Sequence, residues 1–266
     1  APISVSNEYT VFLPCLNLKF EANDNLTLRF GASRTMSRPN LGDISPTTTA
    51  NGISRIITQK NPYLAPFRAN NLDLTAEYYF AKGAMVGVSA FYKDIKSLIR
   101  NETTTETYPV QVIYANGDTQ TADMSFTVNR IVNGEGVKVK GFEVYYQQPF
   151  TFLPAPFDGF GASANYTFID NSDPQQLTAA SRHNFNVTGY YEKGPVGVRL
   201  SYAWRGSYLS TAGTSTVMGV ETQAYGSVDG SASLKVTPNV TLSLEAVNLL
   251  NSAQKASYTT GLPSNY

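Results

Sequence analysis

The sequence predicts an all-β fold, an antiparallel up-and-down transmembrane β-barrel, with about ten strands present. Three observations carry this prediction. Apolar and polar residues alternate with a period of two along most of the chain, aromatic residues gather near the strand ends, and short connections alternate with long ones. The composition agrees, because only 15% of the residues are charged, against about 25% in an ordinary soluble domain.

The first predicted hairpin shows the pattern most clearly. Leu16, Leu18 and Phe20 alternate with polar residues, and the alternation resumes after residues 23–25, Asn-Asp-Asn. Strict alternation is typical of a half-buried strand, and a short turn rich in Asn and Asp is typical of a tight hairpin.

The same pattern recurs along the rest of the chain, and no segment carries a helical stripe of apolar residues. In chain order the ten predicted strands cover residues 16–21, 26–33, 71–80, 86–92, 140–147, 162–168, 184–191, 196–205, 228–236 and 240–246. The short connections fall near residues 23–25, 81–84, 149–159, 192–195 and 237–239, and the long ones near 38–66, 100–130, 171–182 and 206–224. Outer-membrane barrels have short turns on the periplasmic side and long loops outside.

The two faces of the predicted strands differ in chemistry. The polar face carries the charged residues Lys19, Glu21, Arg29, Asp73, Glu77, Glu143, Arg199 and Glu245. Aromatic residues of the apolar face form one group beside the short turns (Tyr78, Phe80, Tyr146, Phe160, Tyr191) and a second group about eight residues away (Tyr92, Tyr166, Phe168, Tyr202, Trp204). Eight tilted strand residues span on the order of 20 Å, close to the ~25 Å apolar band of an outer-membrane barrel. A soluble β-sandwich also alternates and is the main alternative fold.

The phase of the connections predicts that the chain is a segment of a longer barrel. A complete bacterial barrel normally begins and ends in the periplasm, so its first connection is a long external loop. Here the first connection is short, which predicts missing strands at both ends.

The residue counts exclude several classes of function. Twenty basic and twenty acidic residues give a net charge of zero, without the basic excess of a nucleic-acid-binding protein. One Cys and one His exclude a disulfide framework and a Cys/His zinc site, and no catalytic Ser-His-Asp set can be assembled. We therefore expect no enzyme activity, no metal and no cofactor. Cys15 is expected to be an unreactive thiol, and His183 a polar residue at the barrel rim.

Nine short blocks along nearly the whole chain resemble, in order, the C-terminal part of the barrel of TonB-dependent outer-membrane receptors. The likeness is to the carbohydrate-associated type found in Caulobacter- and Xanthomonas-like bacteria. The blocks cover residues 13–17 (LPCLN), 33–39 (SRTMSRP), 61–66 with 70–73 (NPYLAP, NNLD), 91–95 (FYKDI), 139–143 (VKGFE), 147–150 (QQPF), 165–167 (NYT), 191–195 (YEKGP) and 245–249 (EAVNL).

This resemblance implies a 22-stranded barrel closed by an N-terminal plug. Residues 1–266 would then be a partial barrel holding strands twelve to twenty-one, without the plug, the first half of the barrel and the last strand. Residues 262–266 alternate poorly and do not fit the last strand of the family.

The implied function is part of an energy-coupled outer-membrane receptor that imports a scarce nutrient, either an oligosaccharide or a ferric siderophore. The implied partners are the TonB–ExbB–ExbD complex, reached through the plug, the lipid and lipopolysaccharide of the bacterial outer membrane, and the small-molecule substrate. A passive porin-type channel and a soluble β-sandwich used for binding or adhesion are the alternatives.

Ligand contacts are expected in the long external loops, because loops on a rigid scaffold carry function. The candidate residues are Arg38, Asn40, Arg55, Arg68, Arg100, Tyr114, Arg130, Arg205 and Tyr208. Aromatic stacking with Asn and Arg hydrogen bonds would suit a sugar, and clustered arginines would suit the acidic groups of a ferric siderophore.

Overall fold

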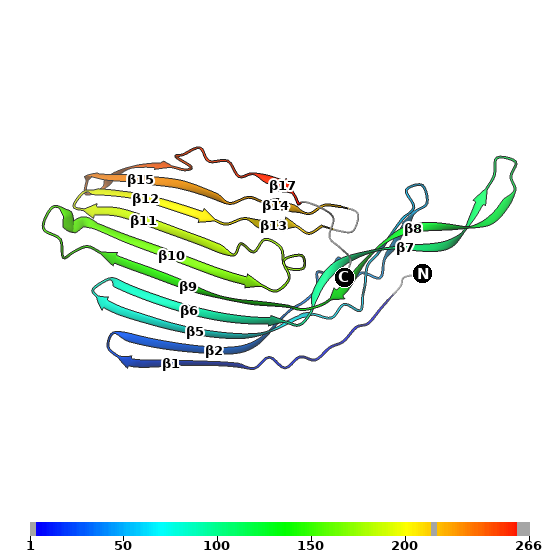
Figure 1. Cartoon of the computed structure of the whole chain (residues 1–266), viewed down its shortest axis with the longest axis horizontal. Coiled ribbons are helices and arrows are strands. Elements are labelled where there is room, and N and C mark those ends of the chain that lie inside the picture. The colour runs from blue at the N-terminus through cyan, green and yellow to red at the C-terminus, as the bar shows by residue number, and fades with distance from the viewer. Residues whose placement is uncertain (1–3, 214–216, 260–266) are drawn as a thin grey trace. The chain divides into compact units, whose positions relative to one another are not determined.

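A computed structural model describes residues 4–213 and 217–259, which form two compact units (Figure 1). The first unit holds residues up to 13 together with 34–69 and 95–136, and the second holds 14–33, 70–94 and the described residues from 137 onward. Residues 262–266, which bear on the expected absence of a last strand, lie outside the described part of the chain.

Ten strands form one sheet whose order is β1-β2-β5-β6-β9-β10-β11-β12-β15-β16, and the strand pairs within it are antiparallel. Their bounds are β1 Cys15–Asn23, β2 Leu26–Ser37, β5 Phe67–Ala81, β6 Ala84–Ile95, β9 Val137–Pro149, β10 Phe160–Asn171, β11 His183–Lys193, β12 Val196–Arg205, β15 Tyr225–Thr237 and β16 Val240–Ala246. Figure 1 shows them side by side in chain order, from β1 in blue to β15 in orange. All ten predicted strands are confirmed, as is the up-and-down order.

The register keeps like faces together across the sheet. In the first hairpin Leu18 lies opposite Phe30, and farther along the sheet Phe185 of β11 lies opposite Trp204 of β12. Side chains alternate between the faces of a strand, so a register shifted by one residue would place apolar residues beside charges. The alternation read from the sequence therefore also sets the pairing.

The described residues leave the apolar face of this sheet uncovered. Leu72 is 47% exposed, Leu74 58%, Tyr78 45% and Phe80 38%. A β-sandwich would bury these side chains in a dry core between two sheets. The sandwich alternative is therefore wrong, and the exposed face has the character of a surface that contacts lipid.

The first unit contains a sheet that the sequence did not predict. Its order is β3-β4-β8-β7, with β3 Thr48–Asn51, β4 Ile56–Gln59, β7 Leu98–Ile113 and β8 Thr119–Gly134. The long connections near 38–66 and 100–130 are thus partly folded into strands. A small core of Ile57, Phe126 and Val128 lies in this sheet, with Tyr108 and Val110 packed against it.

The remaining elements are short. A 3-10 helix, η1, covers Phe157–Gly159, and a three-stranded sheet joins β13 Tyr208–Thr211, β14 Val220–Thr222 and β17 Ala256–Tyr258. Within residues 4–213 and 217–259, no helix is long and apolar enough to cross a membrane.

Candidate functional site

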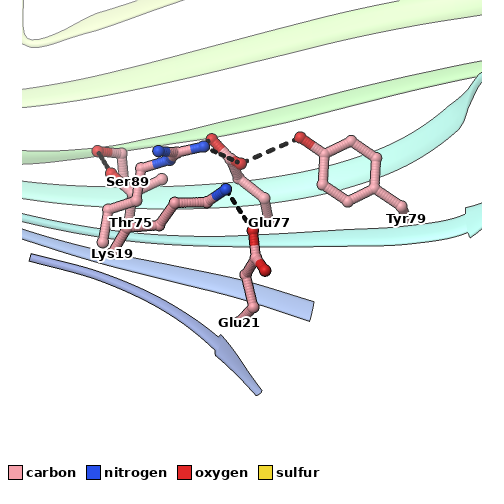
Figure 2. A network of polar contacts seen from close by, with 7 residues as sticks. Lys19, Glu21, Thr75, Glu77, Tyr79 and Ser89 are labelled. Carbon is pink, nitrogen blue, oxygen red and sulfur yellow. Dashed lines mark hydrogen bonds and ion pairs between the residues drawn. The ribbon is translucent and has the colours of Figure 1, made fainter. Parts of the chain in front are cut away.

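The polar face of the ten-stranded sheet carries a network of charged and hydroxyl groups that spans β1, β2 and β5 (Figure 2). The Nε and Nη2 atoms of Arg29 each donate to a carboxylate oxygen of Glu77 at 3.4 Å, and the hydroxyl of Tyr79 donates to Glu77 at 3.0 Å. On β1, Lys19 forms an ion pair with Glu21. These residues lie two apart within each strand, so alternation alone brings them to one face.

Uncharged polar pairs continue this face across the other strands. The uncharged pairs are Thr75–Ser89 at 3.0 Å, Asn186–Asn165 at 3.2 Å and Thr188–Ser201 at 2.8 Å, and Thr167 donates to the charged Glu143 at 3.4 Å. A face built of hydroxyl, amide and charged groups is stable only against water or another polar surface. We call this face the polar wall.

Two shallow hollows lie in the polar wall. One, of about 430 Å³, is lined by residues that include Lys19, Arg29 and Asp73. The other, of about 260 Å³, is lined by residues that include Arg199 and Asp229. Each hollow is lined by both cationic and carboxylate side chains, so neither hollow carries charge of one sign alone.

Aromatic rings form two rows on the opposite, apolar face. Near the short turns the rings of Phe80 and Tyr146 stack at 6.5 Å, and those of Phe160 and Tyr191 meet edge to face at 4.9 Å. Near the long connections the stacked pairs are Phe142–Phe168 at 5.5 Å and Phe185–Trp204 at 5.3 Å. Two aromatic rows separated by an apolar band are typical of the girdles of an outer-membrane barrel.

Two of the predicted loop residues lie together, and one of them is held by the protein. The guanidinium carbon of Arg205 lies 3.8 Å from the ring centre of Tyr208. Its Nε donates to the hydroxyl of Ser181 at 2.8 Å, and Nη2 donates to the carbonyl of Ala179. Ser181 is only 1% exposed and donates in turn to the carbonyl of Gly206 at 2.7 Å. Arg205 therefore fixes the connections around it and presents the Tyr208 ring as a stacked pair.

Arg130 is likewise engaged, in a clamp with Glu106. Its Nη1 and Nη2 each donate to a carboxylate oxygen of Glu106, the latter at 2.7 Å, and its Nε donates to Gln59 at 2.7 Å. Tyr108 and Thr104 add hydrogen bonds to the same carboxylate at 2.7 and 2.9 Å. The hydrogen bond from Arg130, followed by those from Tyr108 and Thr104, lowers the pKa of Glu106 from 4.5 to about 2.

The sequence did not identify Glu106, Gln59 or Ser181 as partners of the candidate arginines. Gln59 and Arg130 lie 71 residues apart, and Ser181 and Arg205 lie 24 apart, in connections without a readable pattern. The signal that was present is the alternation of Glu106 and Tyr108 within the hairpin, which puts both on one face.

Three candidate arginines are exposed, and none has an ion pair or a side-chain hydrogen bond within the described residues: Arg38, Arg55 and Arg68. All three belong to the first unit. Arg38 lines a hollow of about 500 Å³ with Asn7, Glu8, Tyr9 and Thr10. The backbone of Arg55 has a positive φ of 50°, and its carbonyl accepts the amide of Thr127 at 2.9 Å, so its position is fixed while its side chain stays available.

The other three candidates lie on the same unit with partial engagement. Asn40 donates weakly to Asp43 at 3.5 Å, and Arg100 lies 3.7 Å from Glu102. Tyr114 is 48% exposed in the turn between β7 and β8. Among these nine candidates, all in the described part of the chain, Arg205 and Tyr208 are the pair that a direct contact joins.

His183 packs among the aromatic rings of Tyr166 and Phe168, at 6.2 and 5.4 Å between ring centres, and Cys15 lies apart from it at the start of β1. His183 is the first residue of β11, and its Nδ1 atom lies 2.7 Å from the hydroxyl of Tyr166. Cys15 is an exposed free thiol that accepts a hydrogen bond from Asn17 at 3.2 Å. In the described part of the chain no group of three or more His, Cys, Asp and Glu residues is placed to hold a metal ion.

The sequence identifies the family. Residues 3–249 match the family described as TonB dependent receptor-like, beta-barrel. This chain belongs to the TonB-dependent receptor β-barrel family. The family consists of transport receptors of the outer membrane, and the predicted resemblance, fold and location of this receptor barrel are confirmed.

Solved structures show the same fold for this receptor barrel at low identity. A variant of the ferric enterobactin receptor PfeA from Pseudomonas aeruginosa is 20% identical with a TM-score of 0.65, over 90% of this chain and 34% of that chain. The siderophore receptor PirA from Acinetobacter baumannii is 18% identical with a TM-score of 0.69, over 90% of this chain and 36% of that chain. PirA from Pseudomonas aeruginosa is 18% identical with a TM-score of 0.62, over 92% of this chain and 38% of that chain.

This receptor barrel therefore spans little more than a third of the length of the solved structures that it matches. The comparison with curated proteins gave no match.

Proposed function

We propose that this chain forms part of the wall and the outer rim of a receptor that imports a scarce anionic nutrient, a ferric siderophore, with energy from the TonB–ExbB–ExbD complex. The observation that carries the substrate class is a set of three exposed arginines, Arg38, Arg55 and Arg68, to whose side chains the described residues offer no hydrogen bond or ion pair. A guanidinium group binds carboxylates and other planar anions through paired hydrogen bonds and stays charged at every physiological pH. The described neighbours include receptors named for siderophores and for ferric enterobactin, which agrees with this choice.

The proposed division of labour follows from the two faces of the sheet. The apolar face with its aromatic rows lies against lipid, and the polar wall lines the interior of the barrel. There, water and a polar plug would form hydrogen bonds with the polar groups of the wall. Arg38, Arg55 and Arg68, which we call the rim arginines, bind the ligand on the extracellular side. TonB acts on the plug, which is reached from the periplasm, and the wall offers hydrogen-bonding groups along the path that opens.

An oligosaccharide is the second substrate class, favoured by the resemblance to carbohydrate-associated receptors and by exposed rings such as Tyr114. A sugar site would rely on stacking against such rings, with Asn and Arg donating to hydroxyl groups. A passive porin would use the same polar wall without energy coupling.

One experiment separates the three. The gene is deleted, and growth is compared in iron-limited medium supplied with ferric siderophores and in medium with candidate oligosaccharides as the carbon source, each with and without TonB. Loss of growth on a ferric siderophore in both deletions supports the proposal. Loss only on an oligosaccharide overturns the substrate class, and uptake that persists without TonB overturns energy coupling in favour of a porin.

A further inference from the structure

A row of charged side chains lies one step beyond the aromatic row of β9, β10 and β11. Phe168 of β10 lies opposite Phe142 of β9 and His183 of β11. Two residues farther along β10 is Asp170, which lies opposite Lys140. Residues two apart share a face of a strand, so the charged row stands about 7 Å beyond the aromatic row on the same apolar, lipid-facing surface.

Asp170 holds two cations in place without removing them from solvent. Its two carboxylate oxygens lie 3.5 Å from Nζ of Lys140 and 3.0 Å from Nη2 of Arg182. The side chains of Lys140 and Arg182 remain 66% and 64% exposed. The guanidinium carbon of Arg182 lies 6.0 Å from the ring centre of Phe168, so one edge of this cation rests over the aromatic row.

Lys138 adds a third cation to the same face. It precedes Lys140 by two residues on β9 and is exposed. Its backbone is fixed, because its amide donates to the hydroxyl of Ser172 at 2.9 Å and its carbonyl accepts the amide of Ser172 at 3.0 Å. The cluster therefore presents three cations, and one carboxylate bridges two of them.

The cluster has the two-sided chemistry of a lipid headgroup site. Below it lie stacked rings that face the apolar band, and beyond it begins the long connection of residues 172–182. Lys and Arg extend their charged ends towards the headgroup region while their stems stay on apolar surface. A free phosphate ion would use the cations but not the rings beneath them.

We propose that Lys138, Lys140 and Arg182 bind the phosphate groups of a phosphorylated glycolipid of the outer leaflet, whose acyl chains lie against Phe142 and Phe168. The assignment rests on the proposed function for one point, that the long connections face outward. It adds a named lipid-binding site, distinct from the rim arginines and from the polar wall.

The test uses the receptor purified from its own outer membrane in detergent, with binding of fluorescent diphosphoryl lipid A as the readout. The variant Lys140→Gln/Arg182→Gln removes the two cations that Asp170 orients. The matched control, Lys82→Gln/Lys235→Gln, removes two exposed lysines near the short turns. A basic residue near an anionic membrane surface is worth about 1 kcal/mol, so losing two weakens binding about 30-fold.

The expected result is that the control binds as the wild type does and that Lys140→Arg/Arg182→Lys, which keeps both charges, stays within about threefold. This second variant keeps the test decisive if the Gln variant folds poorly, which heat-modifiable gel mobility reports. Equal binding by the wild type and a folded Gln variant overturns the proposal. So does equal affinity for lipid A without phosphates, or complete displacement by inorganic phosphate at the same concentration as the lipid.

Ligand uptake by the Gln variant keeps this proposal separate from the proposed function. Lipid binding that weakens while uptake continues supports the lipid site whatever the imported substrate is. Uptake that fails in the wild type would overturn the proposed function and leave the binding result standing.

Discussion

The substitution Leu74→Arg tests which face of the sheet meets lipid. Leu74 is the central residue of β5, with seven residues on each side, and its side chain is 58% exposed on the apolar face. Seven tilted strand residues cover about 18 Å, so Leu74 lies close to the middle of the apolar band. An arginine at the bilayer midplane on the lipid face of a barrel costs about 2–4 kcal/mol.

Thr75→Arg is the matched control on the neighbouring residue. Thr75 lies on the polar wall and loses only its 3.0 Å hydrogen bond with Ser89, which is worth about 1 kcal/mol or less. The measurement is the free energy of unfolding from reversible urea titration of the receptor in lipid vesicles. Equal costs for the two variants, or a Leu74→Arg variant as stable as the wild type, would refute the assignment of the two faces.

Three further predictions concern the loops and the aromatic rows. The pKa of about 2 for Glu106 lies below its unfolded value of 4.5, so the contribution of its carboxylate to stability is complete above about pH 4.5 and is lost as the pH falls through about 2. Carboxylate NMR should show a titration midpoint at this pH. The variant Glu106→Gln should remove the acid-dependent rise in hydrogen exchange of β7 and β8. The triple variant Arg38→Gln/Arg55→Gln/Arg68→Gln should bind the proposed ligand, a ferric siderophore, at least about 10-fold more weakly, since one charge-assisted hydrogen bond is worth about 1.5 kcal/mol. Calorimetry that finds unchanged affinity would remove these residues from the proposed site. A double-mutant cycle of Phe185→Leu and Trp204→Ala should give a coupling free energy of about 0.5–1.5 kcal/mol, because the two rings stack at 5.3 Å, and a coupling of zero would count against a continuous aromatic row.

The ten-stranded sheet could be predicted because its two faces meet different surroundings. Lipid on one side and a polar interior on the other force the residue pattern to repeat every two positions, as between Leu74 and Thr75. The aromatic rows followed from the same reasoning, since rings such as Phe168 and Trp204 occur at a fixed distance from the connections.

The sheet of the first unit could not be predicted in the same way. In the structure, exposure alternates along residues 98–113. In the sequence, Thr, Asn and Glu occupy both faces for much of this strand, so no apolar face stands out. The β-branched threonines favour an extended backbone, but this propensity alone does not specify which strands pair. The parallel pairing of β4 with β8 supplies that information. That pairing joins Ile57 with Val128, far apart in the chain, and leaves no local signal.

The candidate ligand residues were chosen by position, and position alone does not tell which side chains the protein itself occupies. In the sequence, Arg38, Arg130 and Arg205 all lie at the edge of a predicted long connection and cannot be told apart. Only the structure shows that the last two are bound to Glu106 and Ser181 while Arg38 lines a hollow. Which of the candidates touch the ligand stays a prediction.

The parallel pairing of β4 with β8 has a consequence for the time course of folding. The hairpin of β5 and β6 lies between these two strands in the sequence, and a parallel pair cannot form through a tight turn. A contact that closes so long a loop forms more slowly than the hairpins inside it, because the loss of chain entropy comes before any gain. The small core around Val128 should therefore form late. In a refolding experiment, amide protection in β4 should appear after amide protection in the β5–β6 hairpin.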